Sequence, residues 1–280
     1  MTLVVARIIE NQIKILSDTK ITDPSGTGQG LSNHILKAVI INPNLCICFA
    51  QTISKALRAI KEITIYGDSQ NELDRVLMFF LEKHREGNND PDFIIAALKP
   101  HPSLHRISQG EMISTPATWI GNKDAFEDYQ KHYQYVSQLK ELPEDISLCM
   151  EFAIRHLIDE AIYDDIGDFV IGVTSSPEGF SYINYTSGIS AIRISPTGES
   201  DSISSQTAAM GGNSYSVVTP RKVGIGAIGL HFYQGKFGAI LYPTKNEKPI
   251  IYANVTMDQF KLKVLEDFGF EFIGKNIVDK

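Results

Sequence analysis

The chain has 280 residues, of which 43% are hydrophobic and 21% are charged, an ordinary balance for a globular protein. A chain of this length buries about three quarters of its unfolded surface, so it fits one large domain or a domain with an appendage. Its formal net charge of -7 argues against nucleic acid and against an electrostatic membrane anchor, since both favour basic chains. We therefore expect no nucleic-acid partner and no membrane partner.

Cysteine usage points to a reducing compartment. Cys46, Cys48 and Cys149 are too few and too poorly spaced for a disulfide framework or a zinc site. Cys46 and Cys48 lie in one apolar run, where a strand would bury both on the same face. No apolar run reaches roughly 18 residues, and the N-terminus lacks the basic and apolar blocks of a signal peptide. We expect a cytoplasmic protein without metal or other cofactor.

The first fifty residues predict two strand pairs. Residues 3–9 and 13–17 are β-rich on either side of a turn at residues 10–12, which indicates a hairpin. Residues 23–34 are rich in glycine and predict a mobile loop. Residues 36–50 give two more strands around Asn42-Pro43-Asn44.

Helices and strands then alternate in blocks. A helix over 52–63 has Thr52 as a candidate N-cap, and a second helix over 70–86 ends at Gly87. The remaining elements of this part are strands over 91–100, 103–110 and 117–122, helices over 123–136 and 146–163, and a hairpin over 167–185. Strand blocks separated by helix pairs predict a layered α+β domain rather than a doubly wound fold. The stretch HREGNND is interpreted as a solvated helix end, and His84, His105 and His156 as isolated surface or core-edge residues.

The composition changes after Tyr185. Residues 186–214 are rich in Ser, Thr and Gly and predict an exposed stretch, followed by short strands and a helix over 256–269. We assign 1–185 to the main domain and 186–280 to a C-terminal extension that is partly strand. The spelling G-x-G-x-x-G at 224–229 is followed by alternating, strand-like residues in place of a helix, so it predicts no dinucleotide site.

Three features of the N-terminal block occur in a specific order. Thr2 follows Met1, the segment Asp18-Thr19-Lys20-Ile21-Thr22 closes the second strand, and Lys37 precedes Asn42-Pro43. Together they resemble the start of a proteasome β-type subunit, a member of the N-terminal nucleophile hydrolases. In that family a catalytic threonine opens the first strand, Asp-Ser-Arg-x-Thr closes the second, and an active-site lysine precedes Asn-Pro. The order of the later elements, as far as about Tyr185, is similar to the four-layer αββα sandwich of this family.

The resemblance implies a threonine nucleophile at Thr2 after removal of Met1. A threonine hydroxyl is a poor nucleophile and needs a base, and the free α-amino group of the same residue, with a pKa of about 7.7–8.0, can supply it. Lys37 would favour the alkoxide and help keep the amine neutral, and Asp18 would pair with Lys37. Lys20 would support the same wall of the site.

The resemblance also implies an oxyanion hole and two polar partners. A backbone N–H at Gln51 would stabilise the oxyanion, and Asn122 would hydrogen-bond the amine. Asp164 or Asp165 would correspond to a further acid of the family, and the sequence does not choose between them. The family usually has glycine at the position of Gln51 and Gly-Ser-Gly where this chain has Gly121-Asn122-Lys123.

Three functions follow from these patterns. The main hypothesis is a threonine hydrolase that cleaves peptide or amide bonds through an acyl-enzyme and assembles as a homo-oligomer, as relatives in the family do. A small-molecule amidase is a second possibility, because one fold serves several chemistries. The rival from another class is a non-catalytic structural or binding subunit, which the departures at Gln51 and Asn122 favour.

Overall fold

The computed structural model describes residues 2–20, 37–139, 145–167, 170–182, 204–208, 214–220, 228–232, 236–241, 250–268 and 272–273. The chain divides into two compact units, the first made of residues 1–32 and 36–183 and the second of 33–35 and 184–280. The loop predicted over 23–34 and the boundary predicted after Tyr185 lie outside the described residues.

The first unit contains two antiparallel sheets. One has the strand order β10-β9-β2-β1-β8 and the other β3-β4-β5-β6-β7. The strands of the first sheet are β1 (Leu3–Ile9), β2 (Gln12–Ser17), β8 (Ala117–Gly121), β9 (Ile171–Ser176) and β10 (Gly179–Tyr182). Those of the second are β3 (Ala38–Asn42), β4 (Leu45–Ala50), β5 (Asp92–Ala97), β6 (Ser103–Ser108) and β7 (Glu111–Ser114). The predicted hairpins β1–β2, β3–β4 and β9–β10 are confirmed.

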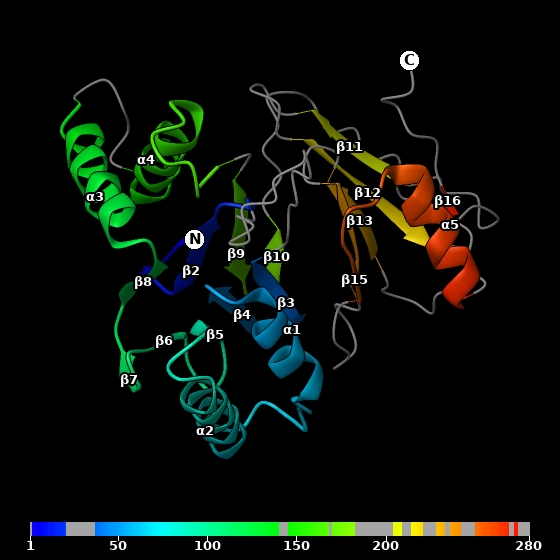
Figure 1. Ribbon diagram of the computed structural model, residues 1–280, viewed down its shortest axis with the longest axis horizontal. Helices are drawn as coiled ribbons and strands as arrows, with labels where there is room; N and C mark the ends of the chain where they lie inside the picture. Colours follow the sequence, from blue (N-terminus) through cyan, green and yellow to red (C-terminus); the bar gives the residue numbers. More distant parts are fainter. Residues whose placement is uncertain are drawn as a thin grey trace. The chain divides into compact units, whose positions relative to one another are not determined.

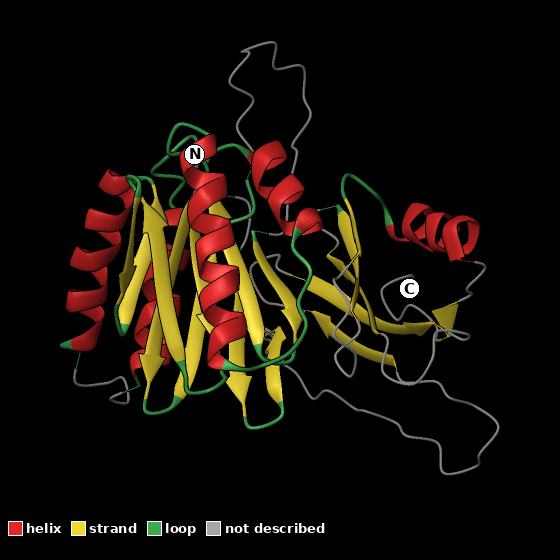
Figure 2. Cartoon of the chain, turned by 90° about the horizontal axis from the view of Figure 1, so that it is seen from below, coloured by secondary structure: helices red, strands yellow, loops and turns green. Residues whose placement is uncertain are grey.

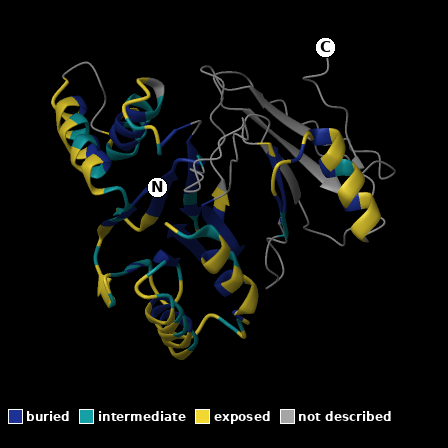
Figure 3. Cartoon of the chain, viewed as in Figure 1, coloured by how far each residue is buried: buried dark blue, intermediate teal, exposed yellow. Residues whose placement is uncertain are grey.

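The two sheets share one hydrophobic core. Val4 and Ile15 of the first sheet pack in the same buried cluster as Cys46, Cys48 and Ile94 of the second. Both cysteines are fully buried free thiols, and burial raises the pKa of Cys46 well above its usual range. The predicted interpretation of this pair as small core residues is therefore confirmed. Figure 3 shows most strands of the unit as its buried interior, whereas β7 is exposed.

A helix pair lies against each sheet. The helices are α1 (Ile53–Glu62), α2 (Gln70–Glu86), α3 (Lys123–Ser137) and α4 (Ile146–Asp159). Contacts join α1 to β4 and α2 to β5 and β6 on one side, and α4 to β2 on the other, with α3 beside α4. Figures 1 and 2 show the strands of this unit between the two helix pairs. The predicted α+β class is confirmed. None of the helices in the described ranges is long and apolar enough to cross a membrane.

The second unit has a sheet of its own. Its strands are β11 (Ser204–Ala208), β12 (Ser214–Pro220), β13 (Ile228–Phe232), β14 (Phe237–Leu241), β15 (Ile250–Tyr252) and β16 (Phe272–Ile273). The predicted C-terminal helix is present as α5 (Met257–Phe268), and its Phe260 packs with Tyr252 and Ile240. Gly229 lies in β13 and the next element is β14, so no helix directly follows the G-x-G-x-x-G spelling in the described residues. The expectation of an exposed stretch over 186–214 misses β11, because its Ser and Thr residues resemble a loop in composition alone.

Three further expectations are wrong. Thr52 precedes α1, but its side chain makes no capping hydrogen bond and donates instead to Asp90. His84, interpreted as an isolated surface or core-edge residue, is fully buried at the end of α2, where its ring nitrogens bond to the Pro91 carbonyl and the Gly110 N–H. His156 is not isolated, since its ring stacks on that of His132 at 3.9 Å.

Candidate functional site

One end of the first sheet brings the start of the chain to Asp18. Strand β1 begins where β2 ends, with Val4 opposite Ser17, so the residues just outside this register lie together. The Leu3 N–H donates to Asp18 Oδ1 at 2.9 Å, and the Asp18 N–H donates to the Leu3 carbonyl at 3.2 Å. The adjacent residue, Thr2, is 4% exposed. The Asp18 carboxylate is thus fixed beside the first strand by a reciprocal pair of bonds.

The second sheet delivers Lys37 to the same end. Lys37 lies just before β3, where its carbonyl accepts the N–H of Phe49 of β4 at 3.0 Å. Its ammonium donates to Asp18 Oδ2 at 2.9 Å and to the Lys20 carbonyl at 2.5 Å. Lys37 and Asp18 are 1% and 0% exposed, so this ion pair is buried and connects the two sheets. The structure therefore brings together Asp18, Lys37 and the backbone of Lys20 next to Thr2.

The electrostatics of the pair follow from its burial. Desolvation raises the pKa of Asp18, while the Lys37 ammonium and the backbone N–H groups of Leu3 and Gly167 act in the opposite direction. Each oxygen of Asp18 has its own donor, which is what a buried carboxylate requires to stay ionised. A cation is thereby held in a position where water is excluded, and electrostatic effects are strong there.

Gly121 is a residue of this region that the sequence analysis did not include among the site residues. It lies opposite Leu3 in the β1–β8 register and has a φ of +110°, in the region that favours glycine. A Cβ at this position would lie 1.8 Å from the Thr2 carbonyl oxygen. Strand β8 can therefore approach the start of β1 only with glycine here. The signal in the sequence was the Gly121-Asn122 pair itself.

Asn122 contacts Thr2 through its backbone. Its N–H donates to the Thr2 carbonyl at 2.7 Å. The side chain caps α3, where Oδ1 accepts the Ala125 N–H, and Nδ2 donates to an Asp165 oxygen at 3.2 Å. Asp165 is half-buried and Asp164 is exposed, so the geometry selects Asp165 as the acid that belongs to this cluster.

Lys20 and Gln51 are the remaining residues that the sequence predicts for the site. The Lys20 side chain is half-buried and lies over Gly167. Gln51 follows β4 with a φ of +75°, a left-handed conformation that residues with a Cβ rarely adopt. Its exposed side chain turns away to Asp92, where Nε2 donates to Oδ2 at 2.9 Å. The left-handed backbone is what glycine would provide at this position.

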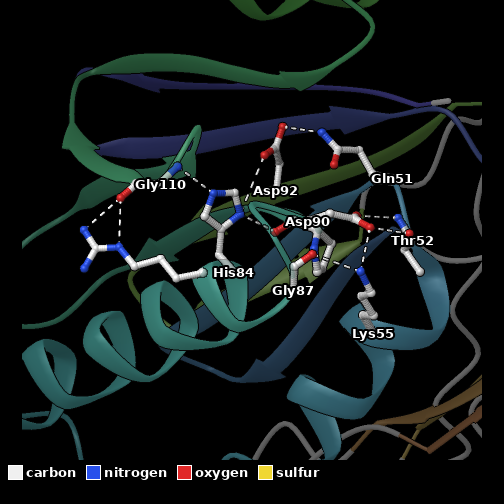
Figure 4. Close-up of polar contacts among 10 residues, drawn as sticks. Gln51, Thr52, Lys55, His84, Gly87, Asp90, Asp92 and Gly110 are labelled. Carbon is white, nitrogen blue, oxygen red and sulfur yellow. Dashed lines mark hydrogen bonds and ion pairs between the residues drawn. The ribbon is translucent and has the colours of Figure 1, made fainter.

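A polar network behind Gln51 is absent from the sequence analysis. It consists of His84, Asp90 and Asp92, which lie at the end of α2, in the following turn and at the start of β5 (Figure 4). His84 and Asp90 belong to HREGNND, the stretch interpreted as a solvated helix end, and Asp92 belongs to the predicted strand over 91–100. Within the described ranges, no group of three or more His, Cys, Asp and Glu side chains could hold a metal ion.

No family model matches this sequence, and no curated protein is significantly similar to it. Among solved structures the chain is similar to eukaryotic HslV from Trypanosoma brucei, with 14% sequence identity and a TM-score of 0.47. The alignment covers 62% of this chain and 99% of the HslV chain. A likeness at this level carries no argument for function, which has to be derived from the geometry of this chain.

Proposed function

We propose that this chain is a proteasome-like N-terminal nucleophile hydrolase with a four-layer αββα sandwich, and that Thr2 is its nucleophile after Met1 is removed. The observation that carries the proposal is the buried Lys37–Asp18 ion pair, with Asp18 bonded to the N–H of the residue after Thr2. A buried ion pair is weak as a source of stability, because desolvation opposes the attraction. Its position beside the first residues of the chain favours a chemical role.

The proposed reaction is amide hydrolysis in two steps. The Thr2 hydroxyl oxygen attacks the carbonyl carbon of the substrate while its proton passes to the Thr2 amine. The amine returns the proton to the leaving nitrogen as the C–N bond breaks, which leaves an ester on Thr2. Water then hydrolyses this ester by the same acid–base steps. Lys37 stabilises the developing alkoxide, and the Gln51 N–H stabilises the oxyanion, a donor whose loss typically costs about a hundredfold in rate.

A second candidate is a non-catalytic subunit on the same scaffold. The observation that favours it is the side chain of Asn122, which caps α3 and binds Asp165. In this arrangement Oδ1 bonds to the Ala125 N–H and Nδ2 bonds to Asp165, and neither bond involves the amine that the reaction needs. The choice between the two candidates therefore depends on the state of the N-terminus.

The substrate class and assembly are part of the proposal. We propose a peptide or a small amide as substrate and a homo-oligomeric assembly, as the resemblance to the proteasome family implies, and a cytoplasmic location, as the cysteine usage indicates. The formal charge of -7 supports a substrate other than nucleic acid.

The test begins with the mass of the intact purified protein. Loss of one methionine is expected for the hydrolase, and a retained Met1 would support the non-catalytic subunit. Labelling with a peptide epoxyketone or a β-lactone should then add one inhibitor mass to the protein and none to Thr2→Ala. Thr64→Ala, which changes an exposed threonine far along the sequence, is the matched control and should label like the wild type. A processed protein that neither reagent labels would contradict the proposal.

A further inference from the structure

Two aspartates hold the turn that connects β4 to α1. Asp92 Oδ2 accepts the side-chain Nε2 of Gln51 at 2.9 Å. Asp90 Oδ1 accepts the Thr52 N–H at 3.0 Å, and Asp90 Oδ2 accepts the Thr52 hydroxyl at 2.5 Å. We call Asp90 and Asp92 the aspartate clamp, because these two residues of one segment hydrogen-bond the consecutive residues Gln51 and Thr52 (Figure 4).

The sheet places the clamp. Asp92 is the first residue of β5 and pairs with Ala50, the last residue of β4. Its side chain therefore starts one residue away from Gln51, and Asp90 starts near Thr52. Lys55 of α1 adds an ion pair to Asp90 at 3.1 Å and a bond to the Gly87 carbonyl at 3.0 Å. The start of α1 is thus tied to the end of α2.

The backbone of Gln51 needs such support. Its φ of +75° lies in the left-handed region, where the Cβ approaches the following carbonyl oxygen. Conformations of this kind persist only where surrounding contacts determine them, and they cluster at functional sites. The bond from the Gln51 amide to Asp92 is such a contact, since it fixes the side chain and with it the backbone.

Asp92 occupies an unfavourable place for a carboxylate. Burial is the largest cause of the rise in its pKa to about 6. The charged and titratable groups that face it are His84 of α2, Asp90 of the adjacent turn and Arg106 of β6. His84 Nδ1 lies 3.8 Å from Asp92 Oδ1. However, that nitrogen bonds to the Pro91 carbonyl at 2.8 Å, and Nε2 accepts the Gly110 N–H at 2.8 Å. Both ring nitrogens of His84 are therefore engaged with the backbone, and its contact with Asp92 is the longer one.

We propose that Asp92 is a positioning residue, which holds Gln51 in its left-handed conformation so that the Gln51 N–H is directed at the developing oxyanion. This inference rests on the proposed function, because it assigns a task to the support of the proposed oxyanion hole. It also explains how a residue with a side chain can stand where the proteasome family has glycine: the side chain is drawn aside by Asp92.

The experiment compares the rates at which a β-lactone labels Thr2 in four proteins: the wild type, Asp92→Asn, Gln51→Gly and the double variant. Asp92→Asn should label about tenfold more slowly, since a hydrogen bond to a charged group becomes a neutral one. Gln51→Gly should label faster than the wild type, because glycine adopts the left-handed conformation unaided and leaves the approach open. The double variant should label like Gln51→Gly, since position 51 then carries no side chain for residue 92 to hold.

Asp74→Asn is the matched control. Asp74 is an exposed aspartate that also accepts a glutamine amide, from Gln70 at 2.7 Å, and its variant should label at the wild-type rate. Thermal unfolding separates positioning from folding: Asp92→Asn should unfold at a temperature no lower than the wild type although it labels more slowly. If Asp92→Asn unfolds at a lower temperature than the wild type and the double variant also labels slowly, Asp92 has a merely structural role and the proposal is overturned. Equal labelling rates for Asp92→Asn and the wild type would overturn it as well.

An unlabelled wild type would be a failure of the proposed function rather than of the clamp. Amide hydrogen exchange at Gln51 and Thr52 then decides the inference. Exchange about tenfold faster in Asp92→Asn than in the wild type supports the clamp, because its weakening frees the backbone of this turn. Equal exchange in the two proteins overturns it.

Discussion

Replacement of Lys37 with Met should destabilise the first unit far more than loss of a surface charge. At 2.9 Å the attraction between Lys37 and Asp18 is about 6 kcal/mol at an effective dielectric constant of about 20. Desolvation of the two ions offsets this attraction, but removal of one partner leaves the other charge buried. We expect Lys37→Met to lower the free energy of unfolding by about 3–5 kcal/mol at neutral pH.

The loss of unfolding free energy in Lys37→Met should be larger at high pH than at low pH. Burial raises the pKa of Asp18 even in the presence of Lys37, and loss of the ammonium raises it further. The pKa of Asp18 in the folded variant then exceeds its unfolded value, so the folded form binds the proton more tightly. The stability of the variant, relative to the wild type, should therefore fall as the pH rises through the folded pKa and recover in acid.

Urea unfolding followed by tryptophan fluorescence measures this effect. Trp119 is the single tryptophan of the sequence and lies in β8, so its signal reports the first unit. The control is Lys131→Met, which removes a surface ion pair with Asp128 whose lysine is 74% exposed, and we expect no measurable loss. A loss below about 1 kcal/mol for Lys37→Met, or an equal loss at pH 5 and pH 8, would refute the reasoning.

Three further predictions concern neighbouring residues. Gly121→Ala should cost at least about 2 kcal/mol of stability, because its Cβ would meet the Thr2 carbonyl oxygen at 1.8 Å and the φ of this residue is +110°. The control is Gly67→Ala, whose Cβ would have nothing within 4 Å and which should change stability by less than about 0.5 kcal/mol in the same urea assay. Asn122→Ala should cost about 1 kcal/mol through loss of the α3 cap, and Asn122→Ser should restore most of it; equal unfolding midpoints for the two variants would contradict the capping role. The folded pKa of Asp92 is about 6, above its unfolded value of 3.8, so its contribution to stability is present in acid and is lost as the pH rises through about 6. Asp92→Asn should therefore gain up to about 3 kcal/mol over the wild type at pH 8 and almost nothing at pH 4, and a gain that does not vary with pH would show that Asp92 has no raised pKa.

The hairpins were predictable because their signals are local. In β1 and β2 the apolar residues and the turn at Glu10 fix the register, and this register alone carries Asp18 to the start of the chain. The motif around Lys37 is also short. The sequence could therefore indicate both members of the ion pair, although it could not show that they meet at 2.9 Å inside the unit.

The clamp was not predictable in the same way. Gln51 and Asp92 are 41 positions apart, and their contact exists only because β4 and β5 pair in one register. A polar segment with a glycine at the end of a helix has the composition of a solvated turn, and composition does not reveal that His84 is buried. The predicted capping bond of Thr52 is absent for a related reason. A hydroxyl at a helix start favours capping, but the hydroxyl of Thr52 donates to the carboxylate of Asp90, a strong acceptor that comes from another turn.

The ion pair itself can separate the hydrolase from the non-catalytic subunit. Buried charges are often replaced by apolar residues without loss of stability, so a scaffold that needs only to fold has no use for this pair. The double variant Asp18→Leu and Lys37→Met should be at least as stable as Lys37→Met alone, since no lone charge remains. If Thr2 is the nucleophile, the same double variant should lose β-lactone labelling although it stays folded. Labelling that survives both changes would leave the pair without a chemical role and would remove the observation on which the hydrolase proposal depends.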